Sequence, residues 1–345
     1  MTNNLWSNYS SPIFVLAPME DVTDTSFREI VLRHSEKDKL HVLYTEFLST
    51  DGFCHPQGRS KVDHRLLVSE SERKLLKEKN VKLVAQIWGN KPENYYRTIK
   101  SIQEEYHFDG IDINMGCPVK NIVAHGSCSA LIDHPSLAHE IIMASKEATS
   151  LPLSLKTRLG VKKIDTERWF SFLLTHPLDA IVVHGRIQKQ MSEGIANWQE
   201  IAKVVRLKDE MAPHIRIIGN GDIFSLAQAR EYSNLYGVDG VMIGRGIFKN
   251  PWLFSERYET GITKRIDTLR SHLDLFESVW GKNKNFAILQ RFFKIYLNGF
   301  DGASDLRQQL MGTKSYDGAR FVIEAFMNNS VINCAPKRAL EACIR

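Results

Sequence analysis

Short apolar segments recur along the first three quarters of the chain. Each is followed by a polar or glycine- and proline-containing turn and then by a stretch with helical spacing. Strands that alternate with helices pair in parallel through crossover connections. The segments predicted to be strands are 13–17, 42–45, 83–87, 110–114, 153–156, 180–184, 215–219 and 238–243. Eight such units predict an α/β fold, the closed (β/α)8 or TIM barrel.

The stretches between these strands carry helix signals. Residues 135–148 place Leu137, Ile141 and Ile142 on one face, and Ser225 can cap a helix over 225–234. The segment 51–79 is longer than a usual connection, and it predicts a helix with an excursion over the barrel mouth.

The pattern changes after residue 254, where only helical spacing remains. Apolar positions with this spacing include Leu269, Leu273, Phe276, Trp280, Ile288, Phe292, Ile295, Leu306, Leu310 and Phe321. We therefore expect a barrel domain over 1–254 and a C-terminal helical bundle of about four helices over 255–345.

Composition narrows the class of protein. The chain is 43% hydrophobic and 25% charged, and it has no apolar run of the ~20 residues that span a bilayer. Its first residues show no basic segment followed by an apolar one, so no secretory leader is expected. Five scattered cysteines without a C-x-x-C pair predict a reduced, cytoplasmic protein with no metal site.

Charge is only mildly basic, but it is uneven. The net charge is +5, and residues 255–345 carry 14 basic and 10 acidic residues. The excess in this last part permits a polyanion partner, although a solvated basic surface explains it equally well.

The stretch 108–121, FDGIDINMGCPVKN, combines a strand with a bend. Period-two alternation places Asp112 and Asn114 on one face, and Gly116 and Pro118 then end the strand around Cys117. A thiol on a fixed turn beside an amide has the layout of a reactive group. A buried cysteine at a tight turn is the alternative reading of this stretch alone.

Polar or reactive residues follow nearly every predicted strand. They are Pro18 and Met19, Glu46, Gln86, Asn114 with Cys117, Lys156 with Arg158, His184 with Arg186, Asn220-Gly221-Asp222, and Gly244-Arg245. Because a barrel builds its active site at the C-terminal ends of its strands, these residues are expected to meet at one rim.

The last two strand ends predict a phosphate site, since glycines there precede helix starts whose backbone N–H groups can bind an anion. Flavin mononucleotide (FMN) would fit such a rim. Pro18 and Met19 would pack on the flavin ring, while Gln86 and Lys156 would meet its polar edge.

The sequence resembles the bacterial tRNA-dihydrouridine synthases, which are FMN enzymes that reduce the 5,6 double bond of a uridine in the D-loop of tRNA. The matching segments are LAPMEDVTDTSFR (16–28), VAQIWG (84–89), GIDINMGCPVKNIV (110–123), SLKTRLG (154–160), VVHGR (182–186), IIGNGDI (217–223) and GVMIGRG (240–246). The C-terminal RFFKIYLNGFDGASDLRQQL is similar to the RNA-binding end of the family.

The resemblance implies a set of site residues. FMN contacts are implied at Pro18, Met19, Glu20, Gln86, Lys156, His184, Asn220, Gly221, Asp222, Gly244 and Arg245. Cys117 falls on the general-acid position, and Asn114, Arg158 and Arg186 fall beside the substrate. The chain departs from the family pattern in HGSCSALI, which contains Cys128, and in IQKQMSEG, which lacks a frequent Thr and Tyr.

The resemblance also implies the mechanism and partners. NADPH or NADH reduces the flavin, hydride passes to carbon 6 of the uracil, and Cys117, expected to have an ordinary thiol pKa, protonates carbon 5. The uridine must leave its stack to enter the barrel. Arg291, Lys294, Arg307 and Lys314 would contact tRNA phosphates and Tyr296 would stack on a base, with the protein acting as a monomer.

Two other functions share parts of this pattern. An FMN barrel acting on a small molecule, such as a dihydroorotate or enone oxidoreductase, would use the same rim but has no need of a basic helical appendage. A non-catalytic RNA-binding or chaperone protein that kept the barrel would not bind flavin.

Overall fold

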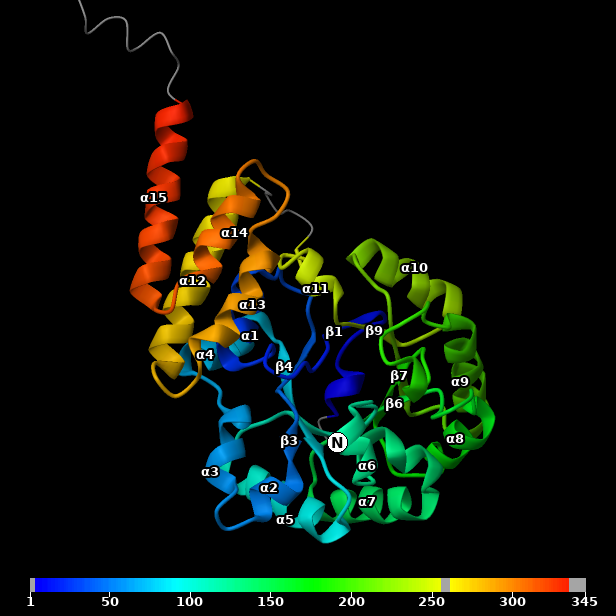
Figure 1. The fold of residues 1–345 in the computed structure, drawn as a ribbon. Coiled ribbons are helices and arrows are strands. Elements are labelled where there is room, and N and C mark those ends of the chain that lie inside the picture. Colours follow the sequence, from blue (N-terminus) through cyan, green and yellow to red (C-terminus); the bar gives the residue numbers. More distant parts are fainter. Residues whose placement is uncertain (1–3, 256–260, 335–345) are drawn as a thin grey trace, which may run out of the picture. The chain divides into compact units, whose positions relative to one another are not determined.

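The computed structural model describes residues 4–255 and 261–334. Contacts divide the chain into two compact units, Met1–Glu256 and Arg257–Arg345. The first unit is built around a ring of parallel strands (Figure 1). Its strands are β1 (Ile13–Leu16), β2 (Val42–Tyr44), β4 (Lys82–Trp88), β5 (Gly110–Met115), β6 (Leu153–Arg158), β7 (Ala180–His184), β8 (Arg216–Asn220) and β9 (Gly240–Ile243).

The ring closes because β1 pairs with β2 on one side and with β9 on the other. β2 pairs directly with β4, and every further neighbour pairs in parallel around to β9. The predicted eight-stranded TIM barrel is therefore confirmed. One additional strand, β3 (Leu48–Ser49), pairs in parallel with the last residues of β4 and was not predicted, since two residues leave no periodic signal.

Alternate strand residues fill the barrel interior, as a period of two requires. Val15, Val182 and Ile218 are completely buried in this core. The 3-10 helix η1 (Leu5–Ser7) joins the core near the beginning of the strands. A Cβ at Gly110, the first residue of β5, would lie 2.8 Å from Cδ2 of Leu5. Leu5 thus packs against the N-terminal ends of the strands, opposite the ends that carry the polar residues.

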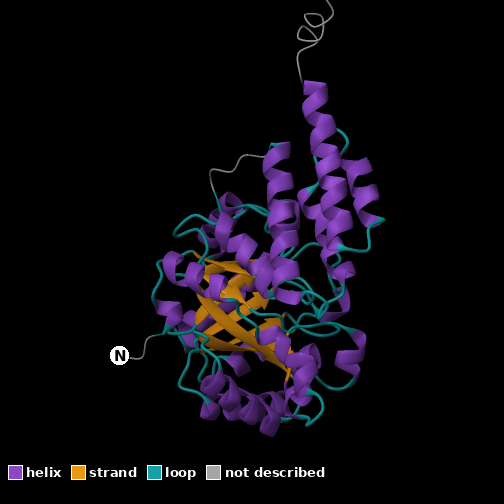
Figure 2. Ribbon diagram, turned by 90° about the vertical axis from the view of Figure 1, so that its left-hand side faces the viewer, coloured by secondary structure: helices purple, strands orange, loops and turns teal. Residues whose placement is uncertain are grey.

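Helices surround the strands of this unit (Figure 2). They are α1 (Thr25–His34), α2 (Thr50–Cys54), α3 (Arg59–Val62), α4 (Glu70–Lys79), α5 (Pro92–Glu105), α6 (Lys120–Ala124), α7 (Pro135–Ala148), α8 (Thr166–Leu173), α9 (Trp198–Met211), α10 (Leu226–Tyr236) and α11 (Gly246–Lys249). The helix predicted over 135–148 is confirmed as α7. Ser225 caps α10 as expected, because its side chain accepts a hydrogen bond from the Gln228 N–H at 3.1 Å.

The long segment after β3 folds as three short helices and one 3-10 turn, η2 (Asp63–Leu66), in agreement with the predicted helix and excursion. A completely buried ion pair ties its last helix, α4, to α1. Arg28 Nε lies 2.6 Å from Glu72 Oε1, and Arg28 Nη2 lies 2.8 Å from Oε2. The Thr25 hydroxyl also donates to Glu72. The excursion is therefore held by a hydrogen-bonded network inside the protein.

The described part of the second unit contains four helices, as predicted: α12 (Ile262–Trp280), α13 (Phe286–Tyr296), α14 (Ala303–Met311) and α15 (Tyr316–Cys334). Leu273, Phe276 and Leu310 are completely buried among them. Phe321, one of the apolar positions with helical spacing, is 72% exposed, because Ala319 and Ile323 form the buried face of α15. None of the described helices is long and apolar enough to cross a bilayer.

Candidate active site at the C-terminal ends of the strands

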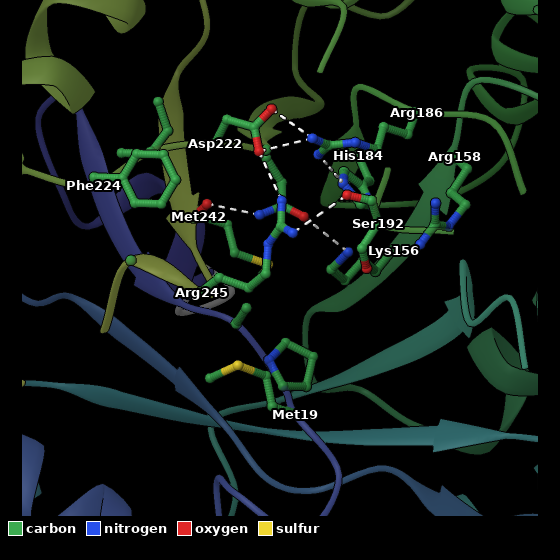
Figure 3. Close-up of a pocket in the computed structure, with 17 residues that line it drawn as sticks. Met19, Lys156, Arg158, His184, Arg186, Ser192, Asp222, Phe224, Met242 and Arg245 are labelled. Carbon is green, nitrogen blue, oxygen red and sulfur yellow. Dashed lines mark hydrogen bonds and ion pairs between the residues drawn. The ribbon is translucent and has the colours of Figure 1, made fainter. Parts of the chain in front are cut away.

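A cavity of about 250 Å³ lies at the C-terminal ends of the strands in the first unit (Figure 3). The predicted site residues that line it are Pro18, Met19, Lys156, Arg158, His184, Arg186, Asn220, Gly221, Asp222, Gly244 and Arg245. Ser192, Phe224 and Met242 also line it and were not predicted. The parallel register explains the convergence, since Arg158 pairs with His184 and His184 pairs with Asn220.

Asp222 is the electrostatic centre of this cavity. Figure 3 shows Arg186 and Arg245 turned toward its carboxylate, with Arg186 Nη2 at 2.6 Å and Arg245 Nη2 at 2.9 Å. The Ala196 N–H also donates to Asp222 Oδ2 at 2.8 Å. Partial burial opposes ionisation, but these hydrogen bonds prevail and lower the pKa of Asp222 below its ordinary value. Asp222 is therefore ionised and pairs with both guanidinium groups.

The two arginines differ in their surroundings. The side chain of Arg186 is 1% exposed, and it donates further hydrogen bonds to the carbonyls of Glu193 and Gly194 at 3.1 and 2.6 Å. The side chain of Arg245 is 50% exposed, and among the described residues its second partner is the Ser192 carbonyl at 3.3 Å. Arg186 is thus a fixed, buried part of the cavity wall, whereas Arg245 can turn toward a ligand in the cavity.

His184 is held neutral beside these cations. Burial, together with the charges of Lys156 and the neighbouring arginines, moves the pKa of His184 well below its ordinary value. Arg186 Nη1 lies 3.2 Å from His184 Nε2. Since a guanidinium only donates, Nε2 accepts and the ring proton resides on Nδ1. His184 therefore presents a neutral N–H.

Lys156 is oriented by Asn220. Its Nζ donates to Asn220 Oδ1 at 3.2 Å, while Asn220 Nδ2 donates to the Met242 carbonyl at 2.8 Å. Burial and the charge of Arg158 lower the pKa of Lys156 to about 8. The ammonium is thus charged at neutral pH and is stabilised further by any anion that enters.

The cavity as a whole carries a positive charge. Among the residues that line it, Lys156, Arg158, Arg186 and Arg245 are cationic, and Asp222 is the only carboxylate. A concave site with such an excess of positive charge attracts anions. Its chemistry therefore suits a phosphate or another oxyanion.

A buried chain of polar side chains leads from β4 to the turn after β5. Gln86 Nε2 donates to Asp112 Oδ2 at 2.7 Å, and Asn114 Nδ2 donates to Gln86 Oε1 at 3.0 Å. Asn114 Oδ1 accepts the backbone N–H groups of Gly116 and Cys117, both at 3.0 Å. Gln86, predicted to contact FMN, is completely buried here and is not among the residues lining the cavity. These hydrogen-bonded side chains fix the turn that carries Cys117.

Asp112 was not predicted as a site residue, although its alternation with Asn114 was a usable signal. It also accepts a hydrogen bond from Ser154 Oγ at 2.6 Å. Burial raises the pKa of Asp112 to about 6, while its hydrogen bonds and the charge of Lys156 act in the opposite direction. Asp112 is therefore a buried, hydrogen-bonded anchor for the neighbouring polar side chains.

Cys117 is partly exposed on the turn between β5 and α6. Arg158 Nε donates to the Gly116 carbonyl at 2.6 Å and so ties the turn to β6. The expected ordinary thiol pKa is wrong. A hydrogen bond with Cys128, which outweighs burial, together with one from the Val119 N–H and the charge of Arg158, lowers the pKa of Cys117 to about 7. Its thiol is a markedly stronger acid than a free cysteine.

Glu20, predicted to contact FMN, lies elsewhere on the rim. Its Oε1 accepts the Arg65 Nε–H at 3.0 Å, and it is not among the residues that line the cavity. The ion pair joins the loop after β1 to the excursion.

The predicted tRNA contacts in the second unit have different surroundings. Arg291, Lys294 and Lys314 are exposed, and Arg307 is half-buried with Nη1 donating to the Leu297 carbonyl at 2.5 Å. The prediction that Tyr296 stacks on a tRNA base is wrong. It is completely buried, and its hydroxyl lies 2.9 Å from His272 Nδ1, so it cannot stack on a base. Its spacing reflects packing between helices.

Fold and site together define an α/β-barrel enzyme with a cationic cavity near the turn that carries Cys117. Across the described residues, no three side chains of His, Cys, Asp or Glu gather to hold a metal ion. The chain belongs to the dihydrouridine synthase (Dus) family, whose pattern matches residues 15–331. The predicted family and the predicted oxidoreductase class are confirmed.

Curated relatives match almost the full length. "Probable tRNA-dihydrouridine synthase 2" of Bacillus subtilis (strain 168) is 43% identical over 94% of this chain and 97% of its own. "Probable tRNA-dihydrouridine synthase" of Staphylococcus aureus (strain COL) is 44% identical over 94% of this chain and 96% of its own. Histamine dehydrogenase from Rhizobium sp. 4-9 shares the fold alone, with a TM-score of 0.52, 11% identity, and coverage of 79% of this chain and 51% of that one.

Proposed function

We propose that this protein is a cytoplasmic, monomeric tRNA-dihydrouridine synthase. It uses FMN and NADPH or NADH to reduce the 5,6 double bond of a D-loop uridine in tRNA, with Cys117 as general acid. Family membership supports the activity and substrate class. The observation that carries the proposal is the adjacency of two parts: a cationic cavity at the ends of β6–β9, and a polar turn after β5 that presents Cys117.

The cavity suits FMN by its donor set. Arg245 and the backbone around Gly221 and Gly244 can take the phosphate, while Lys156 and His184 offer N–H groups to the polar edge of the flavin ring. A Cβ at Gly244 would lie 3.6 Å from the Cβ of Ala17, and both residues line the cavity. Any side chain at 244 would therefore take ligand space. When bound, FMN supplies the hydride for carbon 6 of the uracil.

Cys117 supplies the proton for carbon 5. A general acid works best when its pKa is near the operating pH, and the pKa of Cys117 is about 7. Asn114 holds the turn, so the thiol needs little reorganisation to reach the base. Lys156 and Arg158 carry positive charge beside the turn, where they can stabilise the negative charge that develops on a uracil oxygen.

The tRNA must deliver a flipped uridine to this rim. The exposed cations of the helical unit, Arg291, Lys294 and Lys314, are suited to contact backbone phosphates, whose contribution to affinity is independent of sequence. We retain Arg307 as a weaker candidate because its guanidinium is partly engaged.

Cys117→Ala tests the proposal, with Cys54→Ala as the matched control. Cys54 is also a half-buried free thiol, but it lies on α2 and contacts Thr98 Oγ1 at 3.4 Å. Cys117→Ala should keep flavin absorbance and its bleaching by NADPH, yet lose about 10²–10⁴-fold in dihydrouridine formation. Cys54→Ala should match wild type. Wild-type turnover of tRNA by Cys117→Ala would contradict the role of Cys117.

A further inference from the structure

A second cleft, of about 520 Å³, lies at the C-terminal ends of β3 and β4. Its walls come from three segments: Ser49 and Asp51 at the start of α2, Trp88 at the end of β4, and Asn121 on α6. It shares no lining residue with the cationic cavity, and none of its residues has a part in the function proposed above.

The turn that carries Cys117 lies between the cleft and the cavity. Around the barrel, β5 pairs with β4 on one side and with β6 on the other. β4 ends in Trp88 of the cleft, β5 leads into Cys117, and β6 ends in Arg158 of the cavity. Asn121 belongs to α6, which follows the Cys117 turn and has five residues, a length of about 7.5 Å. The cleft is therefore one short helix away from the proposed acid.

Hydrogen bonds join the cleft to this turn. Asn90 Nδ2 donates to the His125 carbonyl at 2.5 Å and so ties the end of β4 to the end of α6. Ser127 lines the cleft, and two residues further on Ser129 Oγ donates to the Cys117 carbonyl at 2.8 Å. The cleft and the thiol-bearing turn are thus parts of one hydrogen-bonded framework.

The side chains of the cleft suit a flat group with polar edges. Trp88 and Ile122 are partly exposed there and offer an aromatic and an aliphatic surface. Asn121, which is exposed, and Ser127 add an amide and a hydroxyl that can both donate and accept hydrogen bonds. Proteins recognise unstacked nucleobases with this combination, an aromatic face for stacking and polar groups for the base edges.

The charges of the cleft favour a base over a phosphate. Among its lining residues, Lys91 and Asp51 are the only side chains with a permanent charge at neutral pH, and their charges cancel. Asn94 Nδ2 donates to Asp51 Oδ1 at 2.6 Å and fixes this carboxylate. The cationic cavity, in contrast, has four cations and one carboxylate. Phosphate groups therefore prefer the cavity, and a neutral base is suited to the cleft.

We propose that this cleft is a base-binding subsite for a nucleotide that adjoins the target uridine in tRNA, with Trp88 as the stacking platform and Asn121 as a contact to the base edge. The proposal rests on the proposed tRNA-reducing function. In that reaction the uridine lies between the cavity and Cys117, so a nucleotide next to it reaches the cleft across α6. NADPH also carries a base, but its several phosphates favour the cavity.

The first test measures binding of the flavin-loaded enzyme to three tRNA transcripts in filter-binding assays. One is the intact tRNA whose uridine the wild type reduces, with that uridine located by mass spectrometry. In the others, the nucleotide on its 5′ or its 3′ side is abasic. Trp88→Ala should weaken binding of the intact transcript by about 5- to 150-fold, the loss expected for one stacked base. One abasic transcript should weaken wild-type binding by a similar factor, and on it Trp88→Ala should cause no further loss.

Three variants complete this test. Trp88→Phe keeps an aromatic face and should retain most of the affinity. Asn121→Ala changes an exposed side chain, so it remains informative if Trp88→Ala does not fold, and it should weaken the intact transcript by about 2- to 12-fold. Tyr96→Ala is the matched control, because Tyr96 is a partly exposed aromatic residue on α5 that lines neither the cleft nor the cavity, and it should bind like wild type. Wild-type affinity in both Trp88→Ala and Asn121→Ala would overturn the proposal, as would an equal loss on all three transcripts.

The second test measures reduction of the bound flavin by NADPH in stopped-flow experiments without tRNA. Trp88→Ala should match wild type, because the subsite belongs to the tRNA. A weaker dependence on NADPH together with unchanged tRNA binding would assign the cleft to the dinucleotide and overturn the proposal. A wild-type protein that forms no dihydrouridine would overturn the proposed function and the subsite with it. An active wild type with unchanged cleft variants would overturn the subsite alone.

Discussion

Arg186 and Arg245 contact the same carboxylate, yet the structure predicts opposite consequences for removing them. Arg186 is enclosed and holds Asp222, two carbonyls and His184, whereas half of Arg245 faces solvent at the cavity. We expect Arg245→Met to weaken cofactor binding with little effect on stability. Arg186→Met should instead destabilise the fold.

The magnitudes follow from the contacts. A charge-assisted hydrogen bond to phosphate contributes about 1.5–3 kcal/mol, so Arg245→Met should weaken FMN binding by about 10- to 150-fold. Breaking a fully buried ion pair costs about 3–5 kcal/mol. Asp222 is 24% exposed and keeps Arg245, so we expect about 2–3 kcal/mol for Arg186→Met, or a decrease in melting temperature of about 4–12 °C.

Flavin fluorescence titration of the apoprotein gives the FMN affinity, and thermal unfolding of the same samples followed by circular dichroism gives the stability. Arg230→Met provides a matched control, because Arg230 lies over the Phe14 ring, at 5.6 Å, and does not line the cavity. The reasoning is refuted if Arg245→Met binds FMN as tightly as wild type. It is equally refuted if Arg186→Met melts at the wild-type temperature.

Three further predictions concern other parts of the chain. Lys156 loses its proton as pH rises through about 8, so FMN affinity should fall across this pH in wild type but stay flat over the same range in Lys156→Gln. Glu72→Gln breaks the completely buried pair with its arginine and should lower the free energy of unfolding by about 3–5 kcal/mol in urea titrations, whereas Glu78→Gln, from an exposed pair, should change it by less than about 1 kcal/mol. Arg291→Ala should weaken tRNA binding and reduce its salt dependence by about one counterion in filter-binding assays, whereas Tyr296→Phe, a change inside the helical core, should leave both unchanged.

The barrel could be predicted because its signal is local. Each long strand is an apolar run ended by a polar residue or glycine, and such runs must be buried on both faces of a parallel sheet. The same logic placed Lys156, Asn220 and Asp222 at one rim, because all parallel strands of a barrel end on the same side. β3 escaped prediction because Leu48 and Ser49 are too few to show a period.

Burial of particular side chains was less predictable, because it depends on contacts between distant segments. Tyr296 follows the apolar spacing of α13, and that spacing is compatible with either a packing contact or a surface tyrosine at the end of the helix. Only the position of His272 on α12 decides between them. Asp112 likewise has the pattern of an ordinary polar residue on a strand, and only the fold shows that Gln86 and Ser154 enclose it.

The acid strength of Cys117 shows why the chemistry of the site could not be read from the motif alone. The motif supplies a thiol on a turn, and an isolated thiol of this kind has a pKa of about 8.5. Its lower pKa of about 7 comes chiefly from Cys128, which lies in the segment where this chain departs from the family pattern. The pKa of Cys117 therefore depends on a contact from a separate segment, which the motif itself does not contain.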